Sequence, residues 1–166
     1  MHPLFHPLFV DYCSYFNGNE DYFECHEVLE EYWKEIAPGE KQHPLVGYVQ
    51  LATGLYHWRR GNFVGASRIL QKAMTIFEKN DPSHFYEYLN MSDLLEQMHN
   101  SLQLIQEAQH FVAFKLPIVN DGLQLLVSQK ITSLPPLSTQ FIMNKHMLRD
   151  RSDILAAREA KKRSQH

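Results

Sequence analysis

Apolar residues recur at every third or fourth position over most of the chain, and the alternation typical of strands is nearly absent. This period predicts a first helix around residues 5–16 and further helices over about 20–36, 44–60 and 62–79. Turn-forming sequences separate them, namely Asn17-Gly18, Pro38-Gly39, Gly61-Asn62 and Asn80-Asp81-Pro82. We therefore predict an all-α protein that folds as a single-domain helical bundle.

The clearest pair of helices lies within about residues 44–79. Pro44 stands in a first helical turn, where its missing N–H has no consequence, and a two-residue connection at Gly61-Asn62 leads into the next helix. Such a short connection requires antiparallel neighbours. The first of the two helices is apolar almost all round, so we expect this central antiparallel hairpin to hold the core.

The second half of the chain is less regular. Ser92-Asp93 is the expected cap of a long helix that runs to about residue 108, and residues 114–119 are expected to be extended because Pro117 disfavours helix at Leu116. Residues 123–130 are expected to be helical, and a final basic helix is expected over about 139–162. We divide the chain into a helical core domain, residues 1–120, and a C-terminal extension, residues 121–166.

The net charge of −3 conceals an asymmetry. Residues 145–163 carry seven Lys or Arg against three Asp or Glu, which leaves the rest of the chain at −7. An acidic body argues against wrapping nucleic acid, whereas the basic C-terminal helix could weakly touch phosphates or an acidic partner, or simply be a solvated terminal helix. Two cysteines form no framework or redox pair, and the N-terminus is no signal peptide. We expect a cytoplasmic protein without a membrane span.

A polar pair on the second predicted helix is the strongest candidate for chemistry. His26 and Glu30 lie one turn apart at the margin of an apolar stripe made of Tyr22, Cys25, Leu29, Trp33 and Ile36. A carboxylate buried there needs a compensating partner. One flank of the third helix carries Gln50 and His57 two turns apart, with Gly54 between them to let another helix approach. We expect His26, Glu30, Gln50 and His57 to converge on one polar pocket.

Two interpretations of this pocket stay open: it binds a divalent metal or a small ligand, or it is purely structural. His26, Glu30 and His57 would be a common ligand set for Zn²⁺, Mn²⁺, Fe²⁺ or Ni²⁺, with Gln50 and Trp33 as supporting residues and Glu27 as a base for a metal-bound water. The same i, i+4 geometry equally forms a structural hydrogen-bond network without an ion. Two known patterns are excluded: Glu30 replaces the second histidine of the zinc-protease helix, and Phe23 precedes His26 where a di-iron bundle needs Glu.

The chain resembles the bacterial and archaeal domain-of-unknown-function family numbered 309. The first signature block comprises Asn17, Tyr22, Phe23, Glu24, His26, Glu27, Leu29, Glu30 and Trp33. The second comprises Gln50, Leu51, Ala52, Tyr56, His57, Gly61, Asn62, Gly65, Ala66 and Leu70. The likeness covers roughly residues 8–118. It implies a small all-helical fold and a metal-binding role for the His-x-x-x-Glu-x-x-Trp motif, and it implies no particular activity.

The competing function class is a non-enzymatic interaction module. Gly54, Gly61, Ala66, Leu70 and Ala73 follow the small-residue spacing of one tetratricopeptide-like hairpin, although ordinary close packing explains it as well and such arrays need about three units. In that case the partner would be a protein or peptide, and the polar cluster would be a rigid core. Pairing of the acidic second helix with the basic tail would make a homo-oligomer. The sequence leaves open whether the chain is an enzyme.

Overall fold

The computed structural model describes residues 1–134, and the predicted basic helix over 139–162 lies outside them. Six α-helices follow one another: α1 (Pro7–Asn17), α2 (Tyr22–Ile36), α3 (Pro44–Arg59), α4 (Phe63–Lys79), α5 (Met91–Gln106) and α6 (Asp121–Thr132). Two short 3₁₀ helices, η1 (Pro3–Phe5) and η2 (His84–Tyr86), precede α1 and α5. Over these residues the chain forms no strand, only one isolated bridge between Leu89 and Ile118. The all-α prediction is confirmed.

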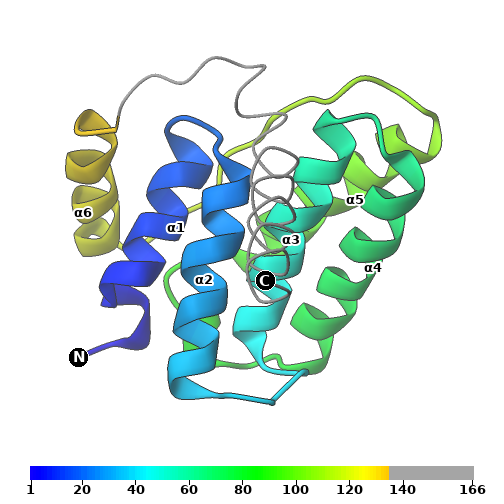
Figure 1. The fold of residues 1–166 in the computed structure, drawn as a ribbon. Coiled ribbons are helices and arrows are strands. Elements are labelled where there is room, and N and C mark those ends of the chain that lie inside the picture. Colours follow the sequence, from blue (N-terminus) through cyan, green and yellow to red (C-terminus); the bar gives the residue numbers. More distant parts are fainter. Residues whose placement is uncertain (135–166) are drawn as a thin grey trace, which may run out of the picture.

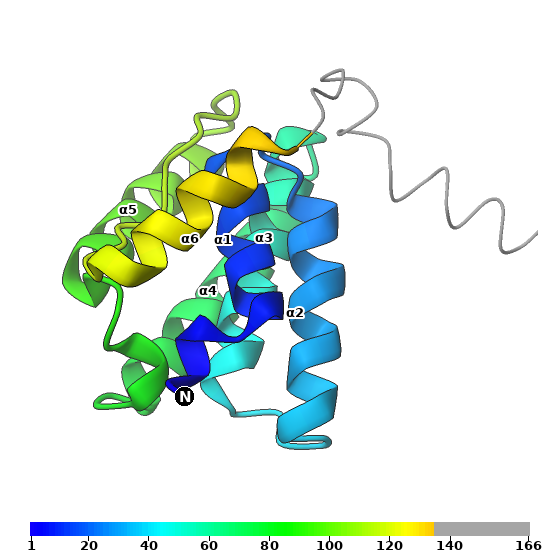
Figure 2. The same ribbon diagram turned by 90° about the vertical axis from the view of Figure 1, so that its left-hand side faces the viewer.

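Helix α3 occupies the centre of the bundle. It packs against α2 on one side and α4 on the other, while α1 packs against α2 and α6, and α5 against α4 (Figure 1). Figure 2 shows α6 lying across α1 on the outside of the bundle. Ten of the sixteen residues of α3 are buried, which agrees with its nearly continuous apolar sequence.

The predicted hairpin of α3 and α4 is confirmed. Gly61 adopts a φ of +80°, a conformation that side chains disfavour, and so makes the tight reversal possible. Asn62 then caps α4, because its Oδ1 accepts a hydrogen bond from the N–H of Gly65 at 3.0 Å. The turn residues thus fix both the end of one helix and the start of the next.

Two glycines of α3, Gly54 and Gly47, face α4 and meet different parts of it. A Cβ placed on Gly54 would lie 3.5 Å from Leu70, which is an ordinary contact. A Cβ placed on Gly47 would lie 2.7 Å from Cε1 of Phe77, whose side chain is buried in the core. At Gly54 the nearby atoms include backbone atoms of α4, namely the N of Leu70 at 3.5 Å and the carbonyl oxygen of Ala66 at 3.6 Å, so the two helix backbones approach each other there. Gly47 instead leaves room for the ring of Phe77.

Three helices begin with a histidine followed by proline. The Nδ1 atoms of His2, His6 and His43 accept hydrogen bonds from the N–H two residues on, at 3.1, 3.1 and 3.0 Å, and so cap η1, α1 and α3. An accepting Nδ1 must be unprotonated. Burial lowers the pKa of His43, despite the opposing charge of Glu40, which favours the accepting form.

The start of α5 differs from the expectation. The predicted cap was Ser92-Asp93, but Asn90 caps the helix, with its Oδ1 accepting from the N–H of Asp93 at 3.0 Å. An amide at this position competes well for the exposed N–H groups of the first turn, so helix formation starts earlier. Residues 114–119 are non-helical as predicted, and they run beside the segment before α5 through the Leu89–Ile118 bridge.

Asn17 ties the end of α1 to this late segment. Its Oδ1 accepts from the N–H of Leu116 at 2.8 Å, and its Nδ2 donates to the carbonyl of the same residue at 3.3 Å. Leu116 is buried. One side chain thereby satisfies both backbone groups of a residue 99 positions away in the sequence.

The predicted helix over 123–130 is confirmed as α6. Leu123 and Val127 are its buried residues, and it packs on α1. The division into a core, residues 1–120, and an extension, residues 121–166, stays a prediction. Among the helices of residues 1–134, none combines the length and the apolar character needed to cross a bilayer.

Candidate functional site

The predicted polar pair lies on the flank of α2 that faces α3. Asp21 caps the N-terminus of this helix, because its Oδ1 accepts a hydrogen bond from the N–H of Glu24 at 3.2 Å. His26 and Glu30 then follow one turn apart, with 3.2 Å between Nε2 and Oε2, and each side chain is 32% exposed. Both are therefore partly buried, as the sequence predicted.

Further charged groups extend the pair along the exposed side of α2. Nδ1 of His26 lies 3.3 Å from Oε1 of Glu27, and Oε1 of Glu30 lies 2.7 Å from Nζ of Lys34. The hydrogen bond to Glu30 raises the pKa of Lys34. This chain of four alternating groups holds the imidazole between two carboxylates. Glu27, predicted as a base, contacts His26 from the solvent side.

A cavity of about 320 Å³ opens between α2, α3 and α4 beside this pair. Its lining residues are His26, Glu30, Trp33, Val46, Val49, Gln50, Thr53 and Ile69. The indole of Trp33 is held in place by a 3.0 Å hydrogen bond from Nε1 to the carbonyl of Glu40. Four of the predicted site residues, His26, Glu30, Trp33 and Gln50, thus line one cavity.

Gln50 contributes an unusual group to this cavity. Its Oε1 is buried and has no hydrogen-bond partner among the residues that the structure describes. Buried acceptors are nearly always paired, since an unpaired one costs about 1–3 kcal/mol. A ligand or water that donates a hydrogen bond would remove this cost.

His57 is not part of the cavity lining. It lies seven residues beyond Gln50 on α3, which corresponds to roughly 10 Å along the helix axis. Its Nδ1 lies 3.4 Å from Nδ2 of Asn62, at the turn into α4. Within residues 1–134 there is no group of three His, Cys, Asp or Glu that could hold a metal ion. The ligand set of His26, Glu30 and His57 is therefore not assembled there, and metal binding stays a prediction.

The apolar side of α2 also differs from the expected stripe. Ile36 is 45% exposed at the end of the helix, whereas Tyr32, which the prediction left out, is buried. Tyr32 donates from its hydroxyl to the carbonyl of Pro3 at 2.7 Å. Helix α2 therefore turns its last apolar residue outward, because its end packs against the N-terminal segment through Tyr32.

The remaining lining residues come from two sources. Val46, Gln50 and Thr53 share the flank of α3 that the sequence identified, whereas Val49 and Ile69 were missed. Val49 directly precedes Gln50 on α3. Ile69 comes from α4, and the sequence of α3 does not reveal which face of α4 turns toward the cavity. Cys25 does not contribute: burial raises the pKa of its thiol well above the usual range, so it is an unreactive core residue.

The lining of the cavity combines polar and apolar groups. The cavity presents an imidazole, a carboxylate, an amide oxygen and the hydroxyl of Thr53 against the apolar surfaces of Trp33, Val46, Val49 and Ile69. A few polar groups in a mostly apolar cavity of about 300–1,000 Å³ are typical of small-ligand sites. The Thr53 hydroxyl already donates to the carbonyl of Val49 at 2.9 Å, so it is available mainly as an acceptor.

Comparison with known proteins identifies relatives of the chain and supplies no reaction. A family model described as a domain of unknown function matches residues 9–69, which include the whole candidate site. The chain is also 36% identical over 163 residues to the uncharacterized protein YpuF of Bacillus subtilis (strain 168), and the alignment covers 94% of each chain. No solved structure matches it.

The coverage has a consequence for the C-terminal extension. An alignment over 94% of this chain must continue well beyond residue 120, so most of the extension has a counterpart in the relative. The extension is thus not peculiar to this chain, although the family model itself ends at residue 69. The likeness to the relative and the family match together show that the chain belongs to the family of the domain of unknown function 309, DUF309.

Proposed function

We propose that the cavity between α2, α3 and α4 binds a small polar molecule that carries a hydrogen-bond donor. The observation that carries this proposal is the buried Oε1 of Gln50, which lacks a partner among the described residues and belongs to the cavity lining. His26 and Glu30 from α2 line the same cavity and supply a further donor and acceptor. A ligand with a donor would pair with Gln50 and present its other polar groups to α2.

Replacement of Gln50 by leucine tests this proposal. We expect Gln50→Leu to raise the free energy of unfolding by about 1 kcal/mol, because it removes an unpaired buried acceptor while it keeps the volume. Urea denaturation measures this change. The exposed Gln71 on α4 is the matched control, since Gln71→Leu removes no buried polar group and should not stabilise the chain. A destabilised Gln50→Leu would show that the oxygen is already paired, for example with ordered water.

The same variant should abolish ligand binding. Trp33 lines the cavity, so its fluorescence reports occupancy when a panel of amine- and hydroxyl-bearing fragments is titrated. We expect hits in the native chain whose signal disappears in Gln50→Leu. Signals that persist in Trp33→Phe arise elsewhere, because Trp58 is buried in the core with its Nε1 donating to the carbonyl of Gln109. Fragments that bind both chains equally would contradict the proposal.

A divalent metal, Zn, Mn, Fe or Ni, is the second candidate. His26 and Glu30 place an imidazole nitrogen and a carboxylate oxygen 3.2 Å apart, and both kinds of atom bind such ions. Zinc sites, however, use three or four protein ligands, and the described residues bring only these two of the predicted three together. The donor set found within residues 1–134 is thus incomplete for a tightly held ion.

Metal analysis of protein purified without an affinity tag separates the two candidates. We expect less than one equivalent of metal per chain, because two ligands bind an ion weakly. Stoichiometric metal that is lost in both His26→Ala and Glu30→Ala would replace the small-molecule proposal with a metal function. Lys34→Ala is the control, since it removes the neighbouring charge of Glu30 without removing a ligand.

A non-enzymatic interaction module remains the alternative of a different class. It needs no cavity chemistry, and Gln50→Leu would then leave every measurable binding property unchanged. A cytoplasmic location, weak contact of the basic C-terminal helix with nucleic acid, and formation of a homo-oligomer stay predictions. The buried free thiols of Cys13 and Cys25 are compatible with a reducing compartment.

A further inference from the structure

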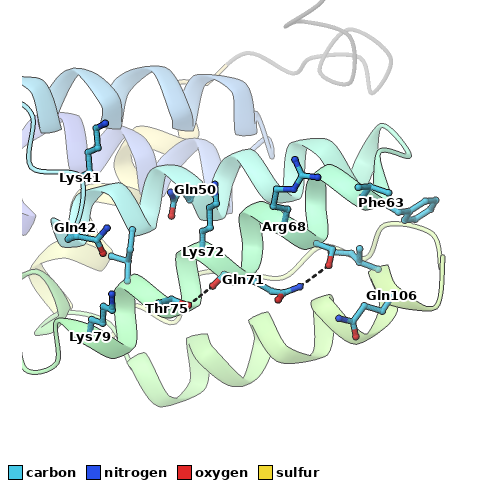
Figure 3. A pocket seen from close by; sticks show the side chains of 14 residues that line it. Lys41, Gln42, Gln50, Phe63, Arg68, Gln71, Lys72, Thr75, Lys79 and Gln106 are labelled. Carbon is cyan, nitrogen blue, oxygen red and sulfur yellow. Dashed lines mark hydrogen bonds between the residues drawn. The ribbon is translucent and has the colours of Figure 1, made fainter.

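A second groove, with a volume of about 940 Å³, also includes Gln50 in its lining (Figure 3). It lies between α4, the end of α5 and the loop before α3. Its positively charged lining residues are Lys41, Arg68, Lys72 and Lys79. Its uncharged polar lining residues are Gln42, Gln50, Ser67, Gln71, Thr75 and Gln106. No Asp or Glu is among the described residues that line it.

The groove is positively charged although the described part of the protein is acidic. Residues 1–134 contain nine Lys or Arg against sixteen Asp or Glu, yet four of the nine cations line this one groove. Within the described part of the chain, none of the four takes part in an ion pair, whereas Lys34 and Lys130 do. Cations that gather in a concave surface without counter-charges produce a focused positive potential, which attracts anions.

The cations of α4 lie on one side of the helix, and two of them are one turn apart. Arg68, Lys72 and Lys79 fall on one side of α4, since intervals of four and seven residues return to the same face of a helix. Lys41 contributes from the loop before α3, and Figure 3 shows Arg68 and Lys72 reaching from α4 toward α3, the side on which Gln50 lies. Arg68 and Lys72 are one turn apart, so a phosphate between them could accept charge-assisted hydrogen bonds from both. Lys79 lies eleven residues from Arg68, about 16 Å along the helix axis, and adds to the positive potential of the groove.

The size and surroundings of the groove favour a small ligand over a nucleic acid. Its volume falls within the range of small-molecule sites, and Ile105 and Gln106 of α5 close one side. A protein that tracks a nucleic-acid backbone needs positive charge along an extended surface. Among the described residues outside the groove, Asp and Glu outnumber Lys and Arg, so the attraction for a polyanion does not continue beyond the groove.

Gln50 joins the groove to the smaller cavity, because it lines both. We propose that the groove binds the phosphate group of a small phosphorylated molecule, whose hydrogen-bond donors reach Oε1 of Gln50. The second half of this statement rests on the proposed function of the cavity. The phosphate site itself depends only on the cations of the groove, above all Arg68 and Lys72.

Calorimetric titration with inorganic pyrophosphate tests the phosphate site in the full chain. We expect binding to the native protein and affinity at least about tenfold weaker in the double variant Arg68→Gln/Lys72→Gln, since two charge-assisted contacts are lost. Lys115→Gln is the matched control, because Lys115 is exposed and remote from the lining, and it should bind as the native chain does. Both substituted residues of the double variant are exposed, so it should fold normally.

The outcomes separate this inference from the proposed function. Retained pyrophosphate binding in Gln50→Leu, together with loss of the Trp33 fragment signal, supports both. Pyrophosphate binding without any Trp33 signal supports the phosphate site and rejects the cavity proposal. Absence of pyrophosphate binding, or equal binding by the double variant and the native chain, overturns the phosphate site whatever Trp33 reports. A twelve-nucleotide oligothymidylate would assign the groove to nucleic acid instead if it binds more than tenfold tighter than pyrophosphate and loses this affinity in the double variant.

Discussion

Replacement of Asn17 by alanine is expected to lower the free energy of unfolding by about 2–3 kcal/mol. The substitution removes two hydrogen bonds, to the N–H of Leu116 at 2.8 Å and to its carbonyl at 3.3 Å. Because Leu116 is buried, water cannot fully replace the partner of its N–H, and an unpaired buried backbone group costs about 1–3 kcal/mol. Its carbonyl keeps one hydrogen bond, from the N–H of Ile118 at 3.0 Å. Urea denaturation of Asn17→Ala measures the loss.

The control for this prediction is the exposed Asn100 on α5. Asn100→Ala removes the same amide from a helix without removing a contact to the buried segment, and it should be nearly neutral. Asn17→Asp should fall between the two, since a carboxylate can accept from the N–H of Leu116 but cannot donate to its carbonyl. A neutral Asn17→Ala would mean that the segment around Leu116 is held by its apolar contacts alone.

The second large effect is expected at Gly47. A Cβ there would come within 2.7 Å of Cε1 of Phe77 and 3.2 Å of Cγ2 of Ile76. The ring of Phe77 is buried and also packs edge-on against Tyr48 at 5.0 Å, so it has little room to move. Overpacking of this kind costs about 1–3 kcal/mol. Gly47→Ala should therefore lower the thermal midpoint clearly, despite the better helix propensity of alanine.

Gly54→Ala is the matched variant, because it makes the same chemical change on the same helix. Its Cβ would meet Leu70 at 3.5 Å, which is normal contact, so the propensity gain of up to about 1 kcal/mol should dominate. The two variants are thus expected to shift stability in opposite directions. Equal destabilisation would show that a methyl group has as little room at position 54 as at position 47.

The sequence predicted most of the fold because local signals and burial agree. The hairpin of α3 and α4 follows from the Gly61-Asn62 turn and from apolar residues all round α3. The start of α5 was placed too late, since Asn90 competes with Ser92 and Asp93 for the same exposed N–H groups and only the geometry shows which one caps. The pairing of Asn17 with Leu116 has no local signal at all.

The candidate site shows where sequence information ends. Spacing along one helix fixed the pairing of His26 with Glu30 and put Gln50 on the facing flank of α3. It also placed His57 on that flank, but sharing a face does not mean sharing a cavity when two residues lie two turns apart. Only the tertiary structure decided this, because the height at which α2 crosses α3 depends on packing.

The basic groove could not be predicted from the sequence either. The sequence by itself determined six helical segments, a central apolar helix and an acidic body, because each is set by residues close together in the chain. It could not indicate that Lys41 would line the same groove as Arg68 and Lys72. That meeting depends on the packing of α3, α4 and α5, in which residues distant along the chain become neighbours.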